Sequence, residues 1–249
     1  MSRIAMGIEY DGAGFCGWQV QQPGIQTVQG VLETALSRVA NAPVRVHCAG
    51  RTDTGVHASH FIAHFDMPST DSCDPSSDQF IFKLNRFLPP DIVVYKIFKV
   101  REDLHARFSA TYRTYHYHIS TYKPLFKREF CHYVYGELDL KAIHACCDLI
   151  LDTSDFTSFA KLHSDVKTNI CMVSHARWQE VDEGYRFEIT ADRFLRNMVR
   201  SITGTLLDVG LGNTDPKGFK EIVEARDRSK AGTSAPAKAL FLVDIGYPV

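Results

Sequence analysis

The sequence has few of the features that mark secreted or membrane-spanning chains. Its seven cysteines are an odd number, and no two of them form a CxxC pair. Arg3 and Glu9 interrupt the only early apolar stretch, and no other run is long and apolar enough to cross a bilayer. We therefore expect no secretory signal and no membrane contact. Free thiols in a reducing, cytoplasmic compartment are the expectation that follows.

The sequence also lacks an excess of charge of either sign. It has 28 basic and 29 acidic residues and a formal net charge of -1, so composition alone does not indicate a nucleic-acid-binding protein. The distribution is less even, because Arg193, Arg196 and Arg200 lie close together in the sequence. A neutral protein can still present one basic face to phosphates, although scattered surface charge explains the same counts.

The hydrophobic pattern of the first half predicts the element order β-α-β-β-α-β. The chain of 249 residues is 45% hydrophobic, which suits one large globular domain or two compact halves. Apolar spacing predicts two helices, the second of them stopped by Pro89 and Pro90. The expected strands cover residues 4–10, 44–48, 61–65 and 92–100, and the expected helices cover residues 28–39 and 81–88. This order is the ferredoxin-like one.

The second half repeats the same order of elements. Asp139 is the expected cap of one helix, and Asp215 followed by Pro216 is the expected start of a short extra one. The expected strands cover residues 112–120, 172–178, 185–191 and 239–245, and the expected helices 140–150 and 195–206. We therefore predict an α+β fold of two ferredoxin-like, RRM-like halves, residues 1–103 and 104–249, with antiparallel sheets joined around a central catalytic cleft. Met67–Gln79 is expected to be a surface loop.

The densest chemical signal is the segment Gly50–Ala58, which reads GRTDTGVHA between two expected strands. Its glycines permit tight turns and the close approach of a ligand to the backbone. Asp53 lies at its centre, and an arginine as near as Arg51 favours the ionised carboxylate that nucleophilic attack requires. The residues alone leave a structural alternative open, in which Asp53 only caps an Asx-type turn.

The motif GRTD-x-GVHA resembles the signature of the tRNA pseudouridine synthase A family. Further segments that resemble the family follow in order along nearly the whole chain. They are residues 10–12, 17–19, 27–33, 105–110, 194–200 and 231–236. The resemblance implies the pseudouridine synthase fold, and it implies that tRNA is the macromolecule on which the protein acts.

The resemblance assigns the catalytic step to Asp53. In the family this aspartate attacks the target nucleoside at the sugar C1′ or acts by a route through a glycal, and the sequence does not choose between them. Tyr115 matches the tyrosine that stacks on the extruded uracil and can assist proton transfer at C5. Arg200 matches the arginine that pairs with the catalytic aspartate. Read without the resemblance, Tyr115 could equally be a core residue, and Arg200 a solvated charge on a helix.

Four residues match family positions that contact RNA. Arg51 matches the residue thought to displace the target base, since a guanidinium can stack in the gap that a flipped base leaves; a surface phosphate contact is the alternative. His105, Arg107 and Phe108 combine cation and aromatic ring, which suits phosphate and base contacts together. The chain departs from some relatives in Asp66–Asp71, which holds no Lys or Arg where they carry a basic residue implicated in base flipping.

The resemblance also implies the setting of the reaction. It implies a homodimer that isomerises uridines at positions 38, 39 and 40 of the anticodon stem-loop, with no small-molecule cofactor. We expect no metal site, because His57, His60 and His64 do not converge when they lie on a loop followed by a strand. Two alternatives remain from other classes: an RNA-binding protein that kept the fold without catalysis, and an aspartate-dependent hydrolase of a small nucleoside.

Overall fold

The computed structural model describes residues 2–67, 74–161 and 167–248. The chain divides into two compact units, an N-terminal unit of Met1–Thr111 with Leu242–Val249, and a C-terminal unit of Tyr112–Phe241. The N-terminal unit therefore continues past residue 103, where the sequence suggested a division, and takes up the end of the chain. Each unit has its own buried apolar side chains, with Trp18 and Phe61 in the first and Trp178 in the second.

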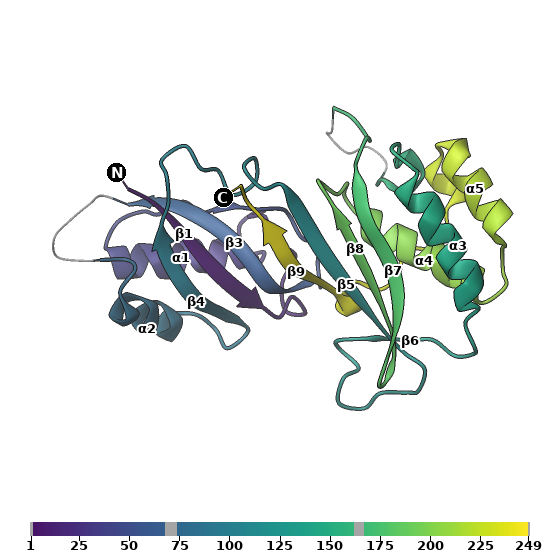
Figure 1. Ribbon diagram of the computed structural model, residues 1–249. Helices are drawn as coiled ribbons and strands as arrows, with labels where there is room; N and C mark the ends of the chain where they lie inside the picture. The colour runs from purple at the N-terminus through teal and green to yellow at the C-terminus, as the bar shows by residue number, and fades with distance from the viewer. Residues whose placement is uncertain (1, 68–73, 162–166, 249) are drawn as a thin grey trace. The chain divides into compact units, whose positions relative to one another are not determined.

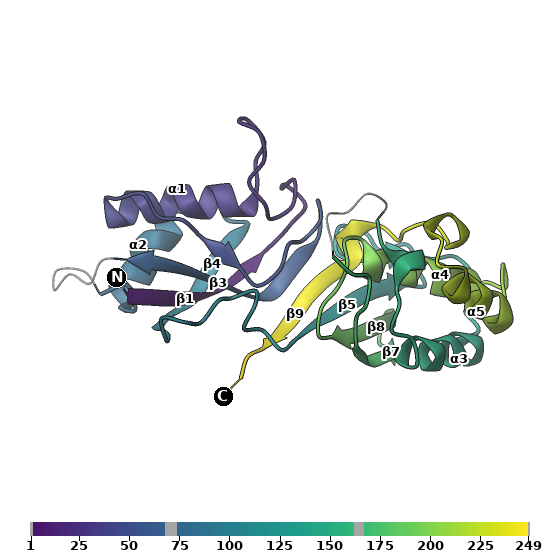
Figure 2. The same cartoon turned by 90° about the horizontal axis from the view of Figure 1, so that it is seen from above.

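The N-terminal unit has the predicted order of strands and helices. Strand β1 (Ser2–Tyr10) pairs antiparallel with β3 (His57–Met67) and with β4 (Ile92–Lys99), while the short β2 (His47–Cys48) pairs with β3. The α+β architecture is confirmed for this half. Figure 2 shows helices α1 (Val28–Ala40) and α2 (Asp78–Phe87) on one side of these strands.

Side-chain caps fix where both N-terminal helices begin. The Thr27 hydroxyl accepts from the backbone nitrogen of Gly30, and the Ser77 hydroxyl accepts from that of Phe80, at 3.3 Å in each case. Because α2 begins at Asp78, the expected loop Met67–Gln79 is two residues too long at its end. Residues 68–73 of that expected loop lie outside the described residues.

The C-terminal unit carries the second set of elements (Figure 1). Strand β8 pairs antiparallel with both β5 and β7, and β6 adds a short parallel pair to β5. The strands are β5 (Tyr112–Ser120), β6 (His132–Tyr133), β7 (Val173–Val181), β8 (Gly184–Ala191) and β9 (Leu240–Gly246), and the helices are α3 (Leu140–Leu151), α4 (Met198–Gly210) and α5 (Pro216–Ala225). Residues of β9 from Leu242 onward count with the N-terminal unit.

The predicted helix caps of this unit are confirmed, but one predicted helix start is wrong. Asp139 accepts from the backbone nitrogen of Ala142 at 2.9 Å, and Asp215 accepts from that of Gly218 at 2.7 Å. Helix α4, expected from Leu195, begins only at Met198. The reason is Asn197, whose φ of 66° lies in the left-handed region and cannot belong to a right-handed helix.

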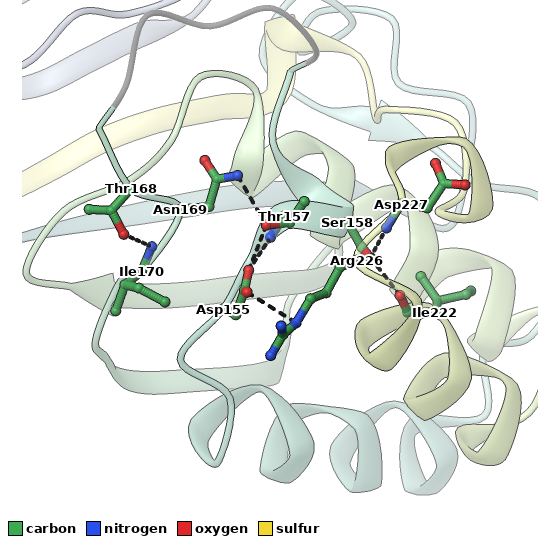
Figure 3. Close-up of polar contacts among 9 residues, drawn as sticks. All are labelled: Asp155, Thr157, Ser158, Thr168, Asn169, Ile170, Ile222, Arg226 and Asp227. Carbon is green, nitrogen blue, oxygen red and sulfur yellow. Dashed lines mark hydrogen bonds and ion pairs between the residues drawn. The ribbon is translucent and has the colours of Figure 1, made fainter.

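A polar network joins the turn around Ser158 to the end of α5 (Figure 3). The buried Ser158 hydroxyl donates to the carbonyl of Ile222 at 2.6 Å and accepts from the backbone nitrogen of Asp227 at 3.0 Å. Beside it, Arg226 lies 3.1 Å from the Asp155 carboxylate. The Ser158 hydroxyl thereby bonds two backbone groups at the end of α5. Leaving such a group unpaired costs about 1–3 kcal/mol, so the hydroxyl stabilises the segment that follows α5.

Two sequence-based expectations concern the chain as a whole. Within the described residues, none of the helices has the length and apolar character that a membrane crossing requires. The six cysteines in that part of the chain are free thiols.

Candidate active site

Asp53 lies at the centre of a tight turn between β2 and β3, and its side chain is half-buried. The carbonyl of Asp53 accepts from the backbone nitrogen of Val56 at 3.2 Å, which closes the turn. Gly55 within it has a φ of 78°, a conformation that favours glycine. The sequence therefore holds a carboxylate on a short, sharply bent segment rather than on a long loop.

Two earlier segments hold this turn by close backbone approach. A Cβ atom at Gly12 would lie 2.0 Å from the carbonyl oxygen of Val56, and one at Gly17 would lie 2.6 Å from that of Thr52. The backbone nitrogen of Trp18 donates to the same Thr52 oxygen at 3.2 Å. The segments 10–12 and 17–19, which carried part of the resemblance, thus support the Asp53 turn.

Buried polar side chains add to this support. The hydroxyls of Tyr10 and Thr52 lie 2.9 Å apart. His57, which is 1% exposed, has its Nδ1 3.1 Å from the backbone nitrogen of Gly12 and 3.0 Å from the Asp11 carboxylate. Sequence reasoning did not assign a role to Tyr10 or His57, and the signal that could have found them is their place inside two motifs of the resemblance.

The segment after β4 forms a small hydrogen-bonded loop that presents a cation and a ring. His105 Nδ1 accepts from the backbone nitrogens of Arg107 and Phe108, at 3.1 and 3.4 Å. The carbonyl of His105 accepts from the backbone nitrogen of Ser109 at 2.9 Å. Phe108 is 76% exposed, and the Arg107 guanidinium lies 5.7 Å from the centre of its ring. An exposed cation–π pair suits phosphate and base contacts.

Arg51 and Arg107 share one neighbourhood within the N-terminal unit. Both are exposed, and the charges of both act on Cys48 at the end of β2. Burial raises the pKa of the Cys48 thiol to about 11, and the two guanidinium groups work in the opposite direction. The charges of both predicted RNA-contacting arginines thus reach the end of the strand that leads into the Asp53 turn.

Tyr115 lies on β5 in the C-terminal unit, opposite Ile189 on β8. Its ring is 9% exposed and meets the ring of Phe194 edge-on, with centroids 5.1 Å apart and planes at 89°. Tyr117, two residues on, is fully buried and donates its hydroxyl to the carbonyl of Pro236 at 3.0 Å. Tyr117 is thus a core residue, and Tyr115 is largely buried on the same face.

Arg200 links helix α4 to the loop of residues 231–236. Its Nε donates to the carbonyl of Ala235 at 2.8 Å, and the backbone nitrogen of Ala235 donates back to the Arg200 carbonyl at 2.9 Å. A Cβ atom at Gly204 would lie 1.8 Å from the carbonyl oxygen of Thr233, so the loop lies directly on the helix. Two segments of the resemblance that are far apart in sequence thus meet here.

The predicted site residues fall into two groups. The N-terminal unit holds Asp53, Arg51 and the His105–Phe108 loop, and the C-terminal unit holds Tyr115 and Arg200. The charges of Arg51 and Arg107 both act on Cys48 in the first unit, while in the second unit Tyr115 packs against Phe194 and Arg200 donates to the carbonyl of Ala235. That Asp53 acts with Tyr115 and Arg200 stays a prediction.

The described residues contain one group of side chains at metal-like spacing, and it was not foreseen. His47, His64 and His105 each place a ligand atom within 4.8 Å of the others. His57 and His60, which the sequence offered together with His64, do not belong to this group. The sequence did not reveal this group, because its members are far apart in the sequence and come from β2, β3 and the loop after β4.

Comparison with known proteins identifies the family to which the chain belongs. The family model described as "tRNA pseudouridine synthase" matches residues 6–109 and 151–248. The tRNA pseudouridine synthase A of Parabacteroides distasonis is 50% identical over 250 residues, covering 100% of this chain and 97% of that protein. The proteins of the same name from Bacteroides thetaiotaomicron and Bacteroides fragilis are 49% and 48% identical, covering 100% of this chain and 91% and 97% of theirs. The chain belongs to the tRNA pseudouridine synthase family.

Proposed function

We propose that this protein isomerises uridine to pseudouridine in the anticodon stem-loop of tRNA, with Asp53 as the nucleophile. The observation that carries the proposal is the turn itself, in which glycines of two separate segments approach the backbone around a half-buried carboxylate. A nucleophile must be held in place against its target, because misplacement by about 1 Å can cost a hundredfold in rate. Family membership supplies the reaction, and the turn supplies the group that performs it.

The proposed reaction moves one bond of the nucleoside without a redox change. The N1–C1′ bond breaks, the uracil turns, and C5 forms a new bond to C1′, while the proton on C5 is lost and N1 gains one. An ionised Asp53 serves either route, by direct attack on C1′ or through the glycal. Tyr115 would stack on the extruded uracil and assist the proton transfer at C5, and Arg200 would balance the charge of the carboxylate.

RNA contacts are assigned to residues of the N-terminal unit. Arg51 would fill the gap that the flipped uridine leaves, since a guanidinium stacks as a flat group. Arg107 and Phe108 would contact the adjacent backbone and a base, which their exposure and their 5.7 Å cation–π distance support. Phosphate contacts of this kind position the RNA rather than read its sequence.

The finer assignments are also proposals. We propose positions 38, 39 and 40 as the target uridines, a homodimer as the active form and the cytoplasm as its compartment. Lysates of a strain without this gene should lack pseudouridine at those three positions of its tRNA. Restoration by the wild-type gene supports the assignment, and modification that persists at all three without it contradicts the assignment.

Release of tritium from tRNA that carries [5-³H]uridine tests the reaction directly. The wild-type protein should release tritium to solvent and leave the RNA chain intact. Binding of tRNA without any release would favour the non-catalytic RNA-binding alternative. Turnover of free uridine in the absence of tRNA would favour the nucleoside hydrolase and contradict our proposal.

A further inference from the structure

Three imidazole rings gather on the surface of the N-terminal unit. His47 on β2 pairs across the sheet with His64 on β3, and their rings stack with centroids 4.9 Å apart and planes at 19°. The ring of His105 lies 4.8 Å from that of His64 and 5.8 Å from that of His47. His64 is buried, His105 is half-buried and His47 is exposed, so the group opens to solvent on one side.

Hydrogen bonds to the backbone fix which nitrogen of two rings carries the proton. The Nδ1 of His64 accepts from the backbone nitrogen of Ala106 at 3.1 Å, and the Nδ1 of His105 accepts from that of Arg107 at 3.1 Å. A neutral imidazole has one acceptor and one N–H, so both rings carry their proton on Nε2. Burial lowers the pKa of His64 to about 4, so this ring is neutral near pH 7, and burial lowers the pKa of His105 as well.

This proton arrangement favours an anion over a metal ion. A metal ion binds the lone pair of one ring nitrogen while the other nitrogen donates its N–H to a carbonyl or carboxylate. In His64 and His105 the other nitrogen, Nδ1, faces a backbone N–H, which cannot accept a hydrogen bond. These two rings therefore lack the arrangement that a metal ligand usually has. The two Nε2–H groups are therefore donors, and three rings with centroids 4.8 to 5.8 Å apart lie close enough together to contact one phosphate.

The charges around the three rings also favour an anion. Asp66 is the carboxylate whose charge acts on His64, and Arg3 binds it in a bidentate ion pair of 2.9 and 3.0 Å. Glu102 and Asp103 act on Arg3. Arg107 acts on His105 and leaves a positive charge beside the group.

The position of the group connects it with the proposed reaction. His47 precedes Asp53 by six residues, and a fully extended chain of that length spans about 20 Å. Arg51 and Arg107 both act on Cys48, the neighbour of His47. We propose that His47, His64 and His105 bind one phosphate of the tRNA backbone within a few nucleotides of the target uridine. This inference rests on the proposed function and adds a subsite to it.

A double-mutant cycle, with a protein variant as one change and a neutralised RNA phosphate as the other, tests the subsite. His47→Ala is the variant of choice because its side chain is exposed, whereas His64 is buried. Each phosphate of an anticodon stem-loop RNA is replaced in turn by a neutral methylphosphonate, and binding is measured for the full-length wild type, for His47→Ala and for Lys83→Ala, an exposed control on α2. At one phosphate near the target, the wild type and Lys83→Ala should lose about tenfold in affinity, and His47→Ala, which keeps the other two rings, should lose less.

Three results would overturn the subsite. In the first, the loss at every phosphate is the same in His47→Ala as in the wild type. In the second, the wild type retains stoichiometric zinc after dialysis and His47→Ala does not. In the third, inorganic phosphate shifts the ring resonances of the three histidines and the RNA leaves them unmoved, which would make free phosphate the ligand. If instead the cycle holds and the wild type releases no tritium, the proposed function fails and the subsite stands.

Discussion

Gly17 lies so close to Thr52 that a Cβ atom on the glycine would stand 2.6 Å from the threonine carbonyl oxygen. That oxygen already accepts a hydrogen bond from the backbone nitrogen of Trp18, so moving it away would disturb this bond. Gly17 also has a φ of 79°, which a residue with a side chain adopts only under strain. The relationship ties a residue near the start of the chain to the position of Asp53.

Gly17→Ala should therefore displace the Asp53 turn. We expect kcat for tRNA to fall by about a hundredfold, because a shift of about 1 Å at the nucleophile is enough for that loss. Gly14→Ala is the matched control, since Gly14 has no atom within 4 Å of an added Cβ and no left-handed φ. Steady-state tritium release measures both variants, and equal rates for the two would show that the contact does not position the turn.

Arg200→Ala should lower the stability of the protein as well as its activity. The Arg200 side chain donates to the carbonyl of Ala235, and its loss removes one of the hydrogen bonds that hold that loop to α4. We expect the free energy of unfolding to fall by about 1–3 kcal/mol. The exposed Arg177→Ala serves as control. A melting temperature of Arg200→Ala that matches the control would count against the structural role.

Ser158→Ala should destabilise the C-terminal unit without touching the proposed chemistry. The change leaves the backbone nitrogen of Asp227 and the carbonyl of Ile222 without the hydroxyl that bonds both. The expected loss is about 1–3 kcal/mol in urea unfolding. Ser174→Ala removes only a long 3.5 Å contact on an exposed residue and should change little. Equal midpoints for the two variants would contradict the account of the network.

Acid should destabilise the fold through the half-buried His118. Burial lowers the pKa of His118 to about 4, from an ordinary value of 6.5, and nearby His116 lowers it further. The folded protein then binds fewer protons than the unfolded chain, so this stability is complete above pH 6.5 and is lost as the pH falls towards 4.

His118→Asn isolates this effect from the titration of carboxylates. Urea midpoints measured between pH 7.5 and about 4 should fall less steeply in the variant than in the wild type, since the variant has no ring to protonate. Parallel curves for the two proteins would show that His118 titrates alike in the folded and unfolded states.

The sequence predicts the local elements well where the signal is local. The caps at Asp139 and Asp215 and the strand Tyr112–Ser120 lie where the residues predicted them. Helix α4 begins three residues late because Asn197 turns left-handed, and neither propensity nor apolar spacing reports that conformation. The short pairing of β6 with β5 was missed for a similar reason, since two residues carry no periodicity.

The same distinction applies to the site, where a local motif reports some residues and only contacts between distant segments reveal the others. Asp53 and its glycines are adjacent in sequence, and a motif reports them. The support from Tyr10 and Gly17 depends on contacts across the fold, and the group of His47, His64 and His105 depends on β2 pairing with β3. Such groups appear only once the register of the strands is known.

Single-turnover tritium release by Asp53→Asn tests the central claim most directly. The variant keeps the size of the side chain and removes its charge, and phosphate contacts dominate affinity for RNA. We predict that tRNA binding stays within about tenfold of the wild type while release falls by at least about 10⁴-fold, with Asp103→Asn, 75% exposed, releasing as the wild type does. Release by Asp53→Asn at a rate near that of the wild type would contradict the assignment of Asp53 as the nucleophile.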